Sequence, residues 1–190
     1  MSKLIFATSN ARKVAEASLV AERHGVILES RALEVEEIQD RDPLEVSRTK
    51  VKAAFVAAGA PVVVNDSSWS IPALNGFPGA YMRDVTRWFV ADDWLKLMAK
   101  RGDRTIVLTE STLFFDGETT KIFQRQQKGR FLEEARGKKN VSIEEVVSLV
   151  EDGRTMAEIT EVGEDRGSAT MDTWEEFFTW YKDEYIDGER

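Results

Sequence analysis

The sequence contains no cysteine among its 190 residues. This absence excludes disulfide bonds, a thiol nucleophile and thiolate metal ligands, and it agrees with the reducing cytoplasm, where we expect the protein to reside. Long hydrophobic runs are lacking as well. No apolar stretch approaches the roughly 20 residues of a membrane span, and the apolar part of the opening segment MSKLIFATSN is too short for a secretory signal. We therefore expect no membrane partner.

Basic charge is in the minority. The chain has 26 Lys and Arg against 34 Asp and Glu, which gives a net charge of -8. This balance disfavours polymeric nucleic acid and anionic membranes as partners, but it permits a small anionic ligand in a local basic pocket. The single histidine, His24, is expected to end the first helix, where a surface or capping role is favoured over catalysis.

The length and the hydrophobic fraction of 42% predict one globular domain over residues 1–190, without repeats or linkers. Apolar periodicity, capping residues and turn residues predict strands and helices in alternation, followed by a long antiparallel hairpin. The expected strands are 4–7, 26–28, 62–64, 105–115 and 118–128, and the expected helices are 11–25, 43–59, 92–102, 142–150 and one beginning at 172. The fold class is therefore α/β, with a mixed, elongated central sheet flanked by helices.

The first candidate site lies between the opening strand and the first helix. Thr8, Ser9 and Asn10 form a polar turn there, and Lys13 lies in the first helical turn. Backbone N–H groups and a partial positive charge at a helix N-terminus favour phosphate, and Lys13 would add a full charge. An ordinary helix cap with a solvated lysine is the alternative interpretation.

The second candidate site follows the β-branched run Val62 to Val64. We expect this buried strand to end at Asn65, Asp66 and Ser67. An aspartate at the end of a buried strand is costly unless it has a partner, and a divalent cation is the usual one when other carboxylates are near. An acidic cluster with Glu37 precedes the helix that carries Lys50. The alternative is a strand followed by a surface loop, with solvated charges along the helix.

Two features of the second half have plain structural interpretations. Residues 142–150 are typical of an amphipathic helix with a capping box. The aromatic stripe Trp174, Phe177, Phe178 and Tyr181 indicates core or dimer packing rather than a platform for stacking bases.

Three segments together resemble the inosine-triphosphate pyrophosphatase family, whose members act on non-canonical purine nucleoside triphosphates. Residues 8–13 are similar to the family's T-x-N-x-x-K phosphate motif, and Glu37 to Gln39 with Lys50 are similar to its acidic metal-binding segment. Residues 65–81 resemble its long E-D-S/T-G-L…A-L-x-G-x-P-G-x-Y signature, and weaker likeness continues through 135–137 and 152–158. The resemblance implies a fold of two lobes around a central cleft, and a homodimer.

The resemblance also implies a hydrolase that cleaves a nucleoside triphosphate between the α- and β-phosphates, giving a monophosphate and pyrophosphate. Mg²⁺ would be held by Glu37 and Asp66, with Asp66 also orienting the attacking water. Lys13 and Lys50 would neutralise phosphate oxygens. Substrate binding would further involve Thr8, Ser9, Asn10 and Ser67.

The chain departs from the family pattern at several positions. Asn65 replaces a glutamate, which removes one negative charge beside the expected metal, and Ser68 replaces a glycine. In the second half, Glu144 stands where the family has its base-stacking segment, and Glu164-Asp165-Arg166 stands for Ser-His-Arg, so that only Arg166 is retained. The carboxylates of Glu164 and Asp165, which accept hydrogen bonds, thus stand where the family has donors. We predict a base preference different from that of the standard family, with Glu144 and Arg166 in the base pocket. A pocket rich in hydrogen-bond acceptors would suit bases that carry exocyclic amines.

Two alternatives remain open at this point. The chain is a catalytically impaired nucleotide-binding module if the loss of the glutamate at position 65 abolishes hydrolysis. It is a pyrophosphatase for pyrimidine or modified-base triphosphates if the changed second half selects a different base.

Overall fold

The computed structural model describes residues 4–138, 141–163 and 168–188. The chain divides into two compact units. Unit 1 comprises residues 1–67, 110–125 and 169–190, and unit 2 comprises residues 68–109 and 126–168. Each unit has a hydrophobic core of its own among the described residues.

The described strands form a mixed sheet of seven strands in the order β2-β1-β3-β5-β6-β7, with β4 paired to β3. The pairs β1–β2 and β1–β3 are parallel, whereas β3–β4 and β6–β7 are antiparallel. The strands are β1 Leu4–Ala7, β2 Leu28–Arg31, β3 Val62–Ser70, β4 Pro78–Gly79, β5 Thr105–Phe115, β6 Thr120–Phe131 and β7 Val147–Ser148. The predicted α/β class with a mixed sheet is confirmed.

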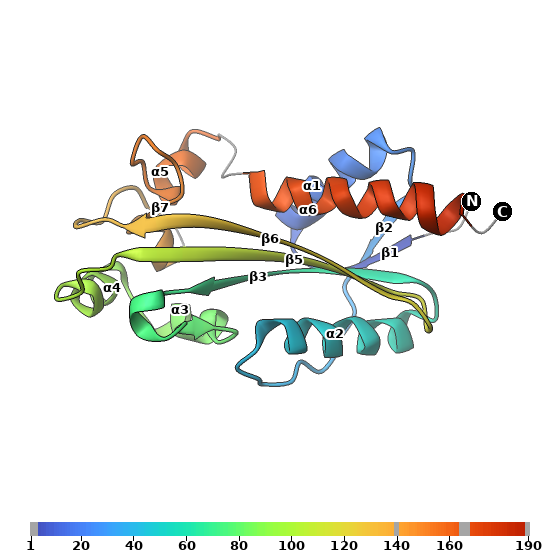
Figure 1. Ribbon diagram of the computed structural model, residues 1–190, viewed down its shortest axis with the longest axis horizontal. Helices are drawn as coiled ribbons and strands as arrows, with labels where there is room; N and C mark the ends of the chain where they lie inside the picture. The colour runs from blue at the N-terminus through green and yellow to red at the C-terminus, as the bar shows by residue number, and fades with distance from the viewer. Residues whose placement is uncertain (1–3, 139–140, 164–167, 189–190) are drawn as a thin grey trace. The chain divides into compact units, whose positions relative to one another are not determined.

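The helices flank this sheet. They are α1 Ala11–Arg23, α2 Pro43–Ala58, α3 Met82–Trp88, α4 Ala91–Met98, α5 Met156–Glu161 and α6 Ser168–Trp180, with the shorter η1 Pro72–Leu74, η2 Ser142–Glu145 and η3 Tyr181–Ile186. In unit 1, α1 and α6 cover one face of the strands and α2 covers the opposite face (Figure 1). No helix within the described ranges is both long enough and apolar enough to cross a bilayer.

Side chains that alternate along β3 build both faces of the unit 1 core. Val62 and Val64 pack with Val51 and Ala54 of α2, whereas Val63 packs with α1 and α6. The aromatic stripe of α6 belongs to this second cluster. Trp174, Phe177, Phe178 and Tyr181 are all buried, which confirms the predicted core role. Trp180 is buried there too.

The core of unit 2 forms around Trp94 and Met98 of α4, which are fully buried. A tight turn at residues 75–79 lies beside this core. Asn75 and Gly76 have positive φ angles of 54° and 87°, and the Phe77–Pro78 peptide is cis. Asn and Gly are the residues that tolerate such φ values, so the sequence specifies this turn directly.

Four sequence predictions were wrong in detail. Strand β6 covers Thr120–Phe131 rather than 118–128. Strand β3 does not end at Val64 but continues to Ser70, because β4 pairs with its second half and its polar side chains find partners. Strand β2 begins at Leu28 rather than at residue 26. Residues 142–150 are not a helix. They form the short turn η2 followed by β7, whose β-branched Val147 pairs with β6.

Several helix boundaries also differ from the predictions. Helix α4 begins at Ala91, because the carboxylate of Asp93 accepts a hydrogen bond from the Val90 amide and caps the first turn. The helix ends at Met98, before the predicted end at residue 102. Helix α6 begins at Ser168, before the predicted start at Asp172. By contrast, α2 agrees with the prediction, with Asp42 as N-cap and Gly59 in the left-handed conformation at its end.

Candidate active site

Asp66 lies in the middle of β3, on the face covered by α2. Its Oδ1 accepts a hydrogen bond of 2.7 Å from Lys50 Nζ, and its Oδ2 accepts one of 3.0 Å from Ser47 Oγ. Ser47 and Lys50 are three residues apart on α2, so both side chains project from the same face of the helix. Strand and helix together therefore hold the carboxylate by both of its oxygens.

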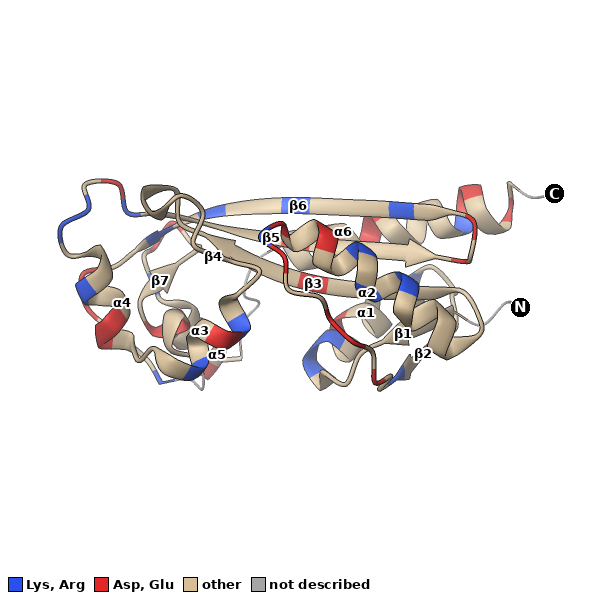
Figure 2. Cartoon of the chain, turned by 90° about the horizontal axis from the view of Figure 1, so that it is seen from below, with Lys and Arg blue, Asp and Glu red and all other residues tan. Residues whose placement is uncertain are grey.

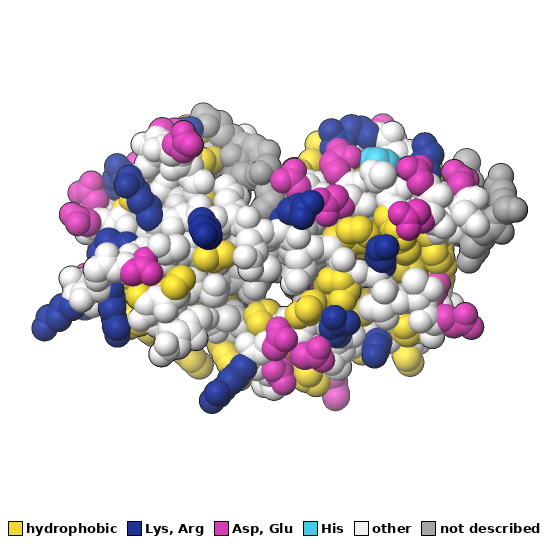
Figure 3. All heavy atoms as spheres, in the orientation of Figure 1, with side chains coloured by type: hydrophobic (Ala, Val, Ile, Leu, Met, Phe, Trp, Pro, Cys, Tyr) yellow, Lys and Arg dark blue, Asp and Glu magenta, His cyan; other side chains and the backbone are white. Residues whose placement is uncertain are grey.

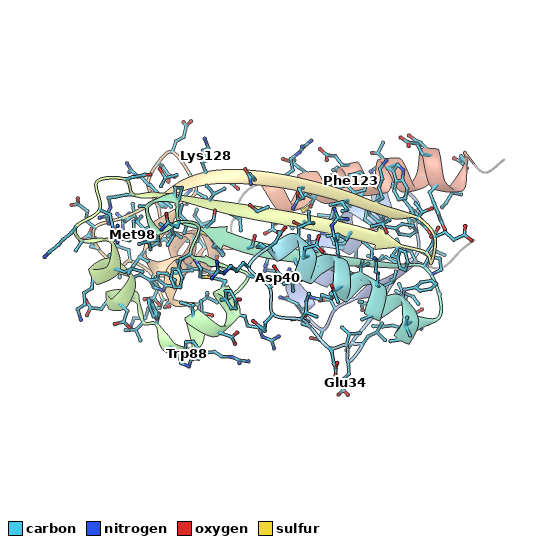
Figure 4. The ribbon with its side chains drawn as sticks, turned by 60° about the horizontal axis from the view of Figure 1, so that its bottom comes forward. Glu34, Asp40, Trp88, Met98, Phe123 and Lys128 are labelled. Atoms are coloured by element: carbon cyan, nitrogen blue, oxygen red, sulfur yellow. The ribbon has the colours of Figure 1, made fainter. Side chains whose placement is uncertain are left out.

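Glu37 joins the same ammonium group from the loop that precedes α2. Its Oε1 lies 3.0 Å from Lys50 Nζ. Figure 2 shows this loop as an acidic stretch running beside α2. Only part of the stretch serves the site, since Asp40 lies against the start of α2 and accepts a hydrogen bond from the Asp42 amide, whereas Glu34 points away (Figure 4). Two acidic side chains from separate segments thus converge on Lys50.

The charges of this group shift its pKa values. Burial by itself would raise the pKa of Asp66, but the Lys50 and Lys13 charges and the hydrogen bonds from Lys50 and Ser47 outweigh it and lower that pKa. Burial would lower the pKa of Lys50, but Asp66 and Glu37 reverse the effect and raise it. Both groups are therefore ionised at neutral pH.

Lys13 approaches β3 from α1. Its Nζ donates a 2.8 Å hydrogen bond to the main-chain oxygen of Asn65. Burial lowers the pKa of Lys13, although the charges of Asp66 and Glu110 oppose the shift. The predicted convergence of a first-helix lysine with the Asp66 segment is therefore present in the structure.

The turn before α1 forms a well-made helix cap. Asn10 Oδ1 accepts hydrogen bonds from the amides of Arg12 and Lys13 at 3.0 and 3.3 Å, and Thr8 Oγ1 accepts one from the Asn10 amide at 3.1 Å. Two of the amides expected to face phosphate are thus occupied by the cap. Ser9 and Asn10 are exposed to solvent, as a binding turn requires.

Glu110 of β5 is a member of this group that the sequence analysis missed. It is only 3% exposed, and its Oε2 accepts a 2.9 Å hydrogen bond from Ser67 Oγ. Burial raises its pKa, and the opposing influence of Lys13, Ser67 and Thr170 is smaller. A signal was available in the sequence. Every second residue from Ile106 to Phe114 is buried, and Glu110 is one of this set, in register with the core residue Phe114.

Asn65 is buried on the same face as Ser67. Its Nδ2 donates to Thr112 Oγ1 at 3.1 Å, and Thr112 donates in turn to Thr173 Oγ1 of α6 at 3.2 Å. The amide oxygen Oδ1 of Asn65 is buried without a hydrogen-bond partner. The position therefore carries a neutral amide that is only half satisfied.

The carboxylates beside Lys50 supply oxygen ligands, which a hard cation such as Mg²⁺ prefers. Within the described part of the chain, no group of three or more His, Cys, Asp or Glu side chains is arranged to hold a metal ion. Glu37 and Asp66 supply two carboxylates on one ammonium. Mg²⁺ is commonly bound by one or two carboxylates together with substrate phosphates and water, so this pair fits it.

The predicted site residues of the second half fall elsewhere. Glu144 is 9% exposed and lies in η2 of unit 2. Arg166 lies outside the described residues, as do Glu164 and Asp165. On the face drawn in Figure 3, basic side chains are interspersed with acidic ones rather than gathered into one broad basic patch.

Comparisons with known proteins place the chain in a family. Over 153 residues it is 31% identical to the dITP/XTP pyrophosphatase of Saccharolobus solfataricus, covering 80% of both chains. It is 29% identical over 181 residues to the dITP/XTP pyrophosphatase of Methanopyrus kandleri, covering 95% of this chain and 96% of that one.

A solved HAM1 protein from Coxiella burnetii has the same fold, with a TM-score of 0.80 and 18% identity over 94% of this chain and 99% of that one. The family model described as the Ham1 family matches residues 4–180. Because this match spans nearly the whole sequence, the chain belongs to the Ham1 family.

Proposed function

We propose that this protein is a Mg²⁺-dependent nucleoside triphosphate pyrophosphohydrolase. It hydrolyses a triphosphate to a nucleoside monophosphate and pyrophosphate. The observation that carries the proposal is the convergence of Glu37 and Asp66 on Lys50, with Lys13 bound to the same strand. The names of the relatives, dITP/XTP pyrophosphatases, support this reaction class.

The two lysines would bind the phosphate chain. Lys50 and Lys13 come from opposite faces of the sheet and both interact with the Asp66 charge. Their ammonium groups would neutralise phosphate oxygens, and the exposed turn Thr8 to Asn10 would hold the outer phosphates by hydrogen bonds. Mg²⁺ bound by Glu37 and Asp66 would supply further neutralisation of phosphate charge.

Asp66 would orient the attacking water. Its lowered pKa keeps it ionised at neutral pH, so its oxygens accept hydrogen bonds. Water adds to the α-phosphorus, the bond from that phosphorus to the bridging oxygen breaks, and pyrophosphate leaves. The water proton passes to a carboxylate oxygen of Asp66. Ser47 and Lys50 fix the carboxylate for this role.

The base preference is a separate part of the proposal. We propose that the protein acts on non-canonical purine or modified nucleoside triphosphates with a preference different from that of its relatives. The support is the sequence alone, through Glu144 and the 164–166 segment. A pyrimidine or modified base is the alternative, and the same substrate panel distinguishes them.

Pyrophosphate release from a panel of canonical and altered triphosphates, with and without Mg²⁺, tests the function. We expect Mg²⁺-dependent release with at least one substrate, and a loss of about 10²–10⁴-fold in kcat for Asp66→Asn. Tight nucleotide binding without turnover in the unaltered protein would instead support a binding module. A clear preference for ITP and XTP over every other substrate would refute the altered base preference.

Dimerisation is proposed from the family resemblance. Trp88 of α3 is 75% exposed and points outward in Figure 4, which is compatible with a protein contact. Light scattering on the purified chain measures the mass directly, and a monomer at micromolar concentration would argue against this proposal.

A further inference from the structure

Glu110 lies beside the candidate active site, but none of the roles described so far uses it. Its side chain is 3% exposed, and it stands on the face of β5 that is covered by α1 and α6. A carboxylate in such surroundings costs free energy when it is ionised. Packing alone therefore gives no reason for a glutamate at this position.

The contacts of Glu110 lead to active-site residues. Ser67, which donates a hydrogen bond to it, directly follows Asp66 in β3. The hydroxyl of Thr170 in α6 supplies a further hydrogen bond. The ammonium of Lys13 makes the largest favourable charge interaction with the carboxylate. Glu110 is thus tied both to the strand that carries Asp66 and to the lysine from α1.

The pleat of β3 explains why two acids surround one lysine. Neighbouring residues of a strand point to opposite faces, so Asp66 faces α2 while Ser67 faces α1 and α6. Lys13 Nζ is bound to the main-chain oxygen of Asn65, at the edge between these two faces. Asp66 and Glu110 both act on its charge. The ammonium consequently has an acidic neighbour on each side of the strand.

We propose that Glu110 is a positioning residue for the phosphate-binding lysine: it fixes the Ser67 hydroxyl and balances the charge of Lys13, so that the ammonium is held at Asn65, ready for the triphosphate. This inference rests on the pyrophosphohydrolase function proposed above. Glu110 itself needs no contact with the substrate, because its effect passes through Lys13 and Ser67.

The test compares kcat and KM of the unaltered protein with those of Glu110→Gln. Glutamine keeps the shape of the side chain and an acceptor for Ser67, but it removes the charge. We expect kcat to fall about 10- to 100-fold, as for other residues that orient a site from behind, with a much smaller change in KM.

Ser111→Ala is the matched control. Ser111 is the next residue of β5 and is also buried, but its side chain points to the opposite face, where its hydroxyl accepts a hydrogen bond from Gln124. We expect this variant to keep the unaltered rate. An equal loss in Ser111→Ala would mean that general disturbance of β5 explains the effect, and the inference would be wrong.

A second variant separates charge balance from packing. Asn65 is on the same face of the neighbouring strand, and Lys13 binds its main-chain oxygen. The double variant N65E/E110Q returns a carboxylate to the neighbourhood of the same ammonium. We expect the kcat of the double variant to be about tenfold higher than that of E110Q, a recovery that a purely structural role of Glu110 would not produce.

The outcomes distinguish this inference from the function on which it rests. Absence of pyrophosphate release by the unaltered protein overturns the proposed function, and the inference with it. Turnover by the unaltered protein with an unchanged rate in E110Q, or no recovery in N65E/E110Q, overturns the inference alone.

If E110Q does not fold, Glu110→Asp replaces it. This variant keeps the charge but draws it back from Ser67. We then expect about a tenfold loss of kcat, and the unaltered rate would contradict us.

Discussion

Asp66 and Glu110 are both acids of unit 1, the first half-buried and the second buried, but they lie on opposite faces of the sheet and their pKa values shift in opposite directions. Burial penalises the charge of both. Asp66 is in direct contact with the ammonium of Lys50, whereas the hydrogen bonds to Glu110 come from hydroxyl groups and Lys13 acts on it through charge alone. The difference teaches that a directly bonded cation outweighs burial in setting the direction in which the pKa of a carboxyl group in this core shifts.

The largest expected effect comes from removing that cation. Lys50→Met leaves Asp66 and Glu37 without their shared ammonium. We expect kcat to fall at least about 10²-fold if the lysine also binds phosphate, and the free energy of unfolding to drop by about 3 kcal/mol. Steady-state kinetics and chemical denaturation measure the two effects.

Lys52→Met is the control for this variant, since Lys52 is an exposed lysine on the same helix. Its kinetics and stability should match those of the unaltered protein within experimental error. Equal effects in the two variants would show that charge on α2, rather than the contact with Asp66, is what matters.

The contributions of Asp66 and Glu110 to stability should depend on pH in opposite directions, because their pKa values shift in opposite directions. Because the pKa of Asp66 is lowered on folding, its contribution to stability is present above about pH 3.8 and is lost as the pH falls through its folded value. Because the pKa of Glu110 is raised, its contribution is present below about pH 4.5 and is lost as the pH rises through its folded value.

Denaturation of D66N, E110Q and the unaltered protein at a series of pH values measures this contrast. E110Q should gain stability relative to the unaltered protein as the pH rises from about 4.5 toward the raised pKa of Glu110. D66N should lose stability relative to the unaltered protein as the pH rises from the lowered pKa of Asp66 up to about 3.8, with a constant difference above that pH. Parallel curves for the two variants would contradict the assigned pKa directions.

The smallest expected effect concerns the hydrogen bond that Ser47 donates to Asp66. Ser47 is 2% exposed and donates a hydrogen bond to Asp66 Oδ2. Ser47→Ala should raise the pKa of Asp66 and cost about 1–2 kcal/mol of stability, since one carboxylate oxygen loses its donor. Ser18→Ala, at an exposed position of α1, is the control and should cost much less.

Much of the fold could be predicted from the sequence because local signals agree with the tertiary structure. The cap and Pro at the start of α2, Gly59 at its end, and the alternation over Thr105–Phe115 all specify elements that the structure contains. The resemblance to a nucleotide pyrophosphatase family is confirmed by the match to the Ham1 family. The expectation of two lobes around a cleft stays a prediction.

The errors have tertiary causes. The polar run at Asn65 to Ser67 indicated the end of a strand, but Lys50, Thr112 and Glu110 supply partners that let the strand continue. Periodicity over 142–150 suited a helix, whereas pairing with β6 makes β7 the better arrangement for Val147. Contacts between segments far apart in sequence decided both cases, and periodicity within one segment does not contain them.

The candidate site was predicted only where motif and geometry coincide. Lys13, Glu37, Lys50 and Asp66 come together as expected, although their roles remain proposals. Glu110 was missed because a glutamate in an alternating strand is normally assigned to the solvent face, and only its register with Phe114 indicates otherwise.

The tip of the β5–β6 hairpin rests on the helix that carries Lys50. Gly117 has a φ of 106°, and a Cβ at this position would lie 2.9 Å from the ring of Phe55, which itself packs edge-on against Phe115. Glycine at the tip therefore lets the hairpin approach α2 closely, and this contact joins the strand of Glu110 to the helix of Lys50. A larger residue at position 117 would have to move the Phe55 ring and adopt a backbone conformation that only glycine takes readily, so the contact between the hairpin and the helix of Lys50 depends on this glycine.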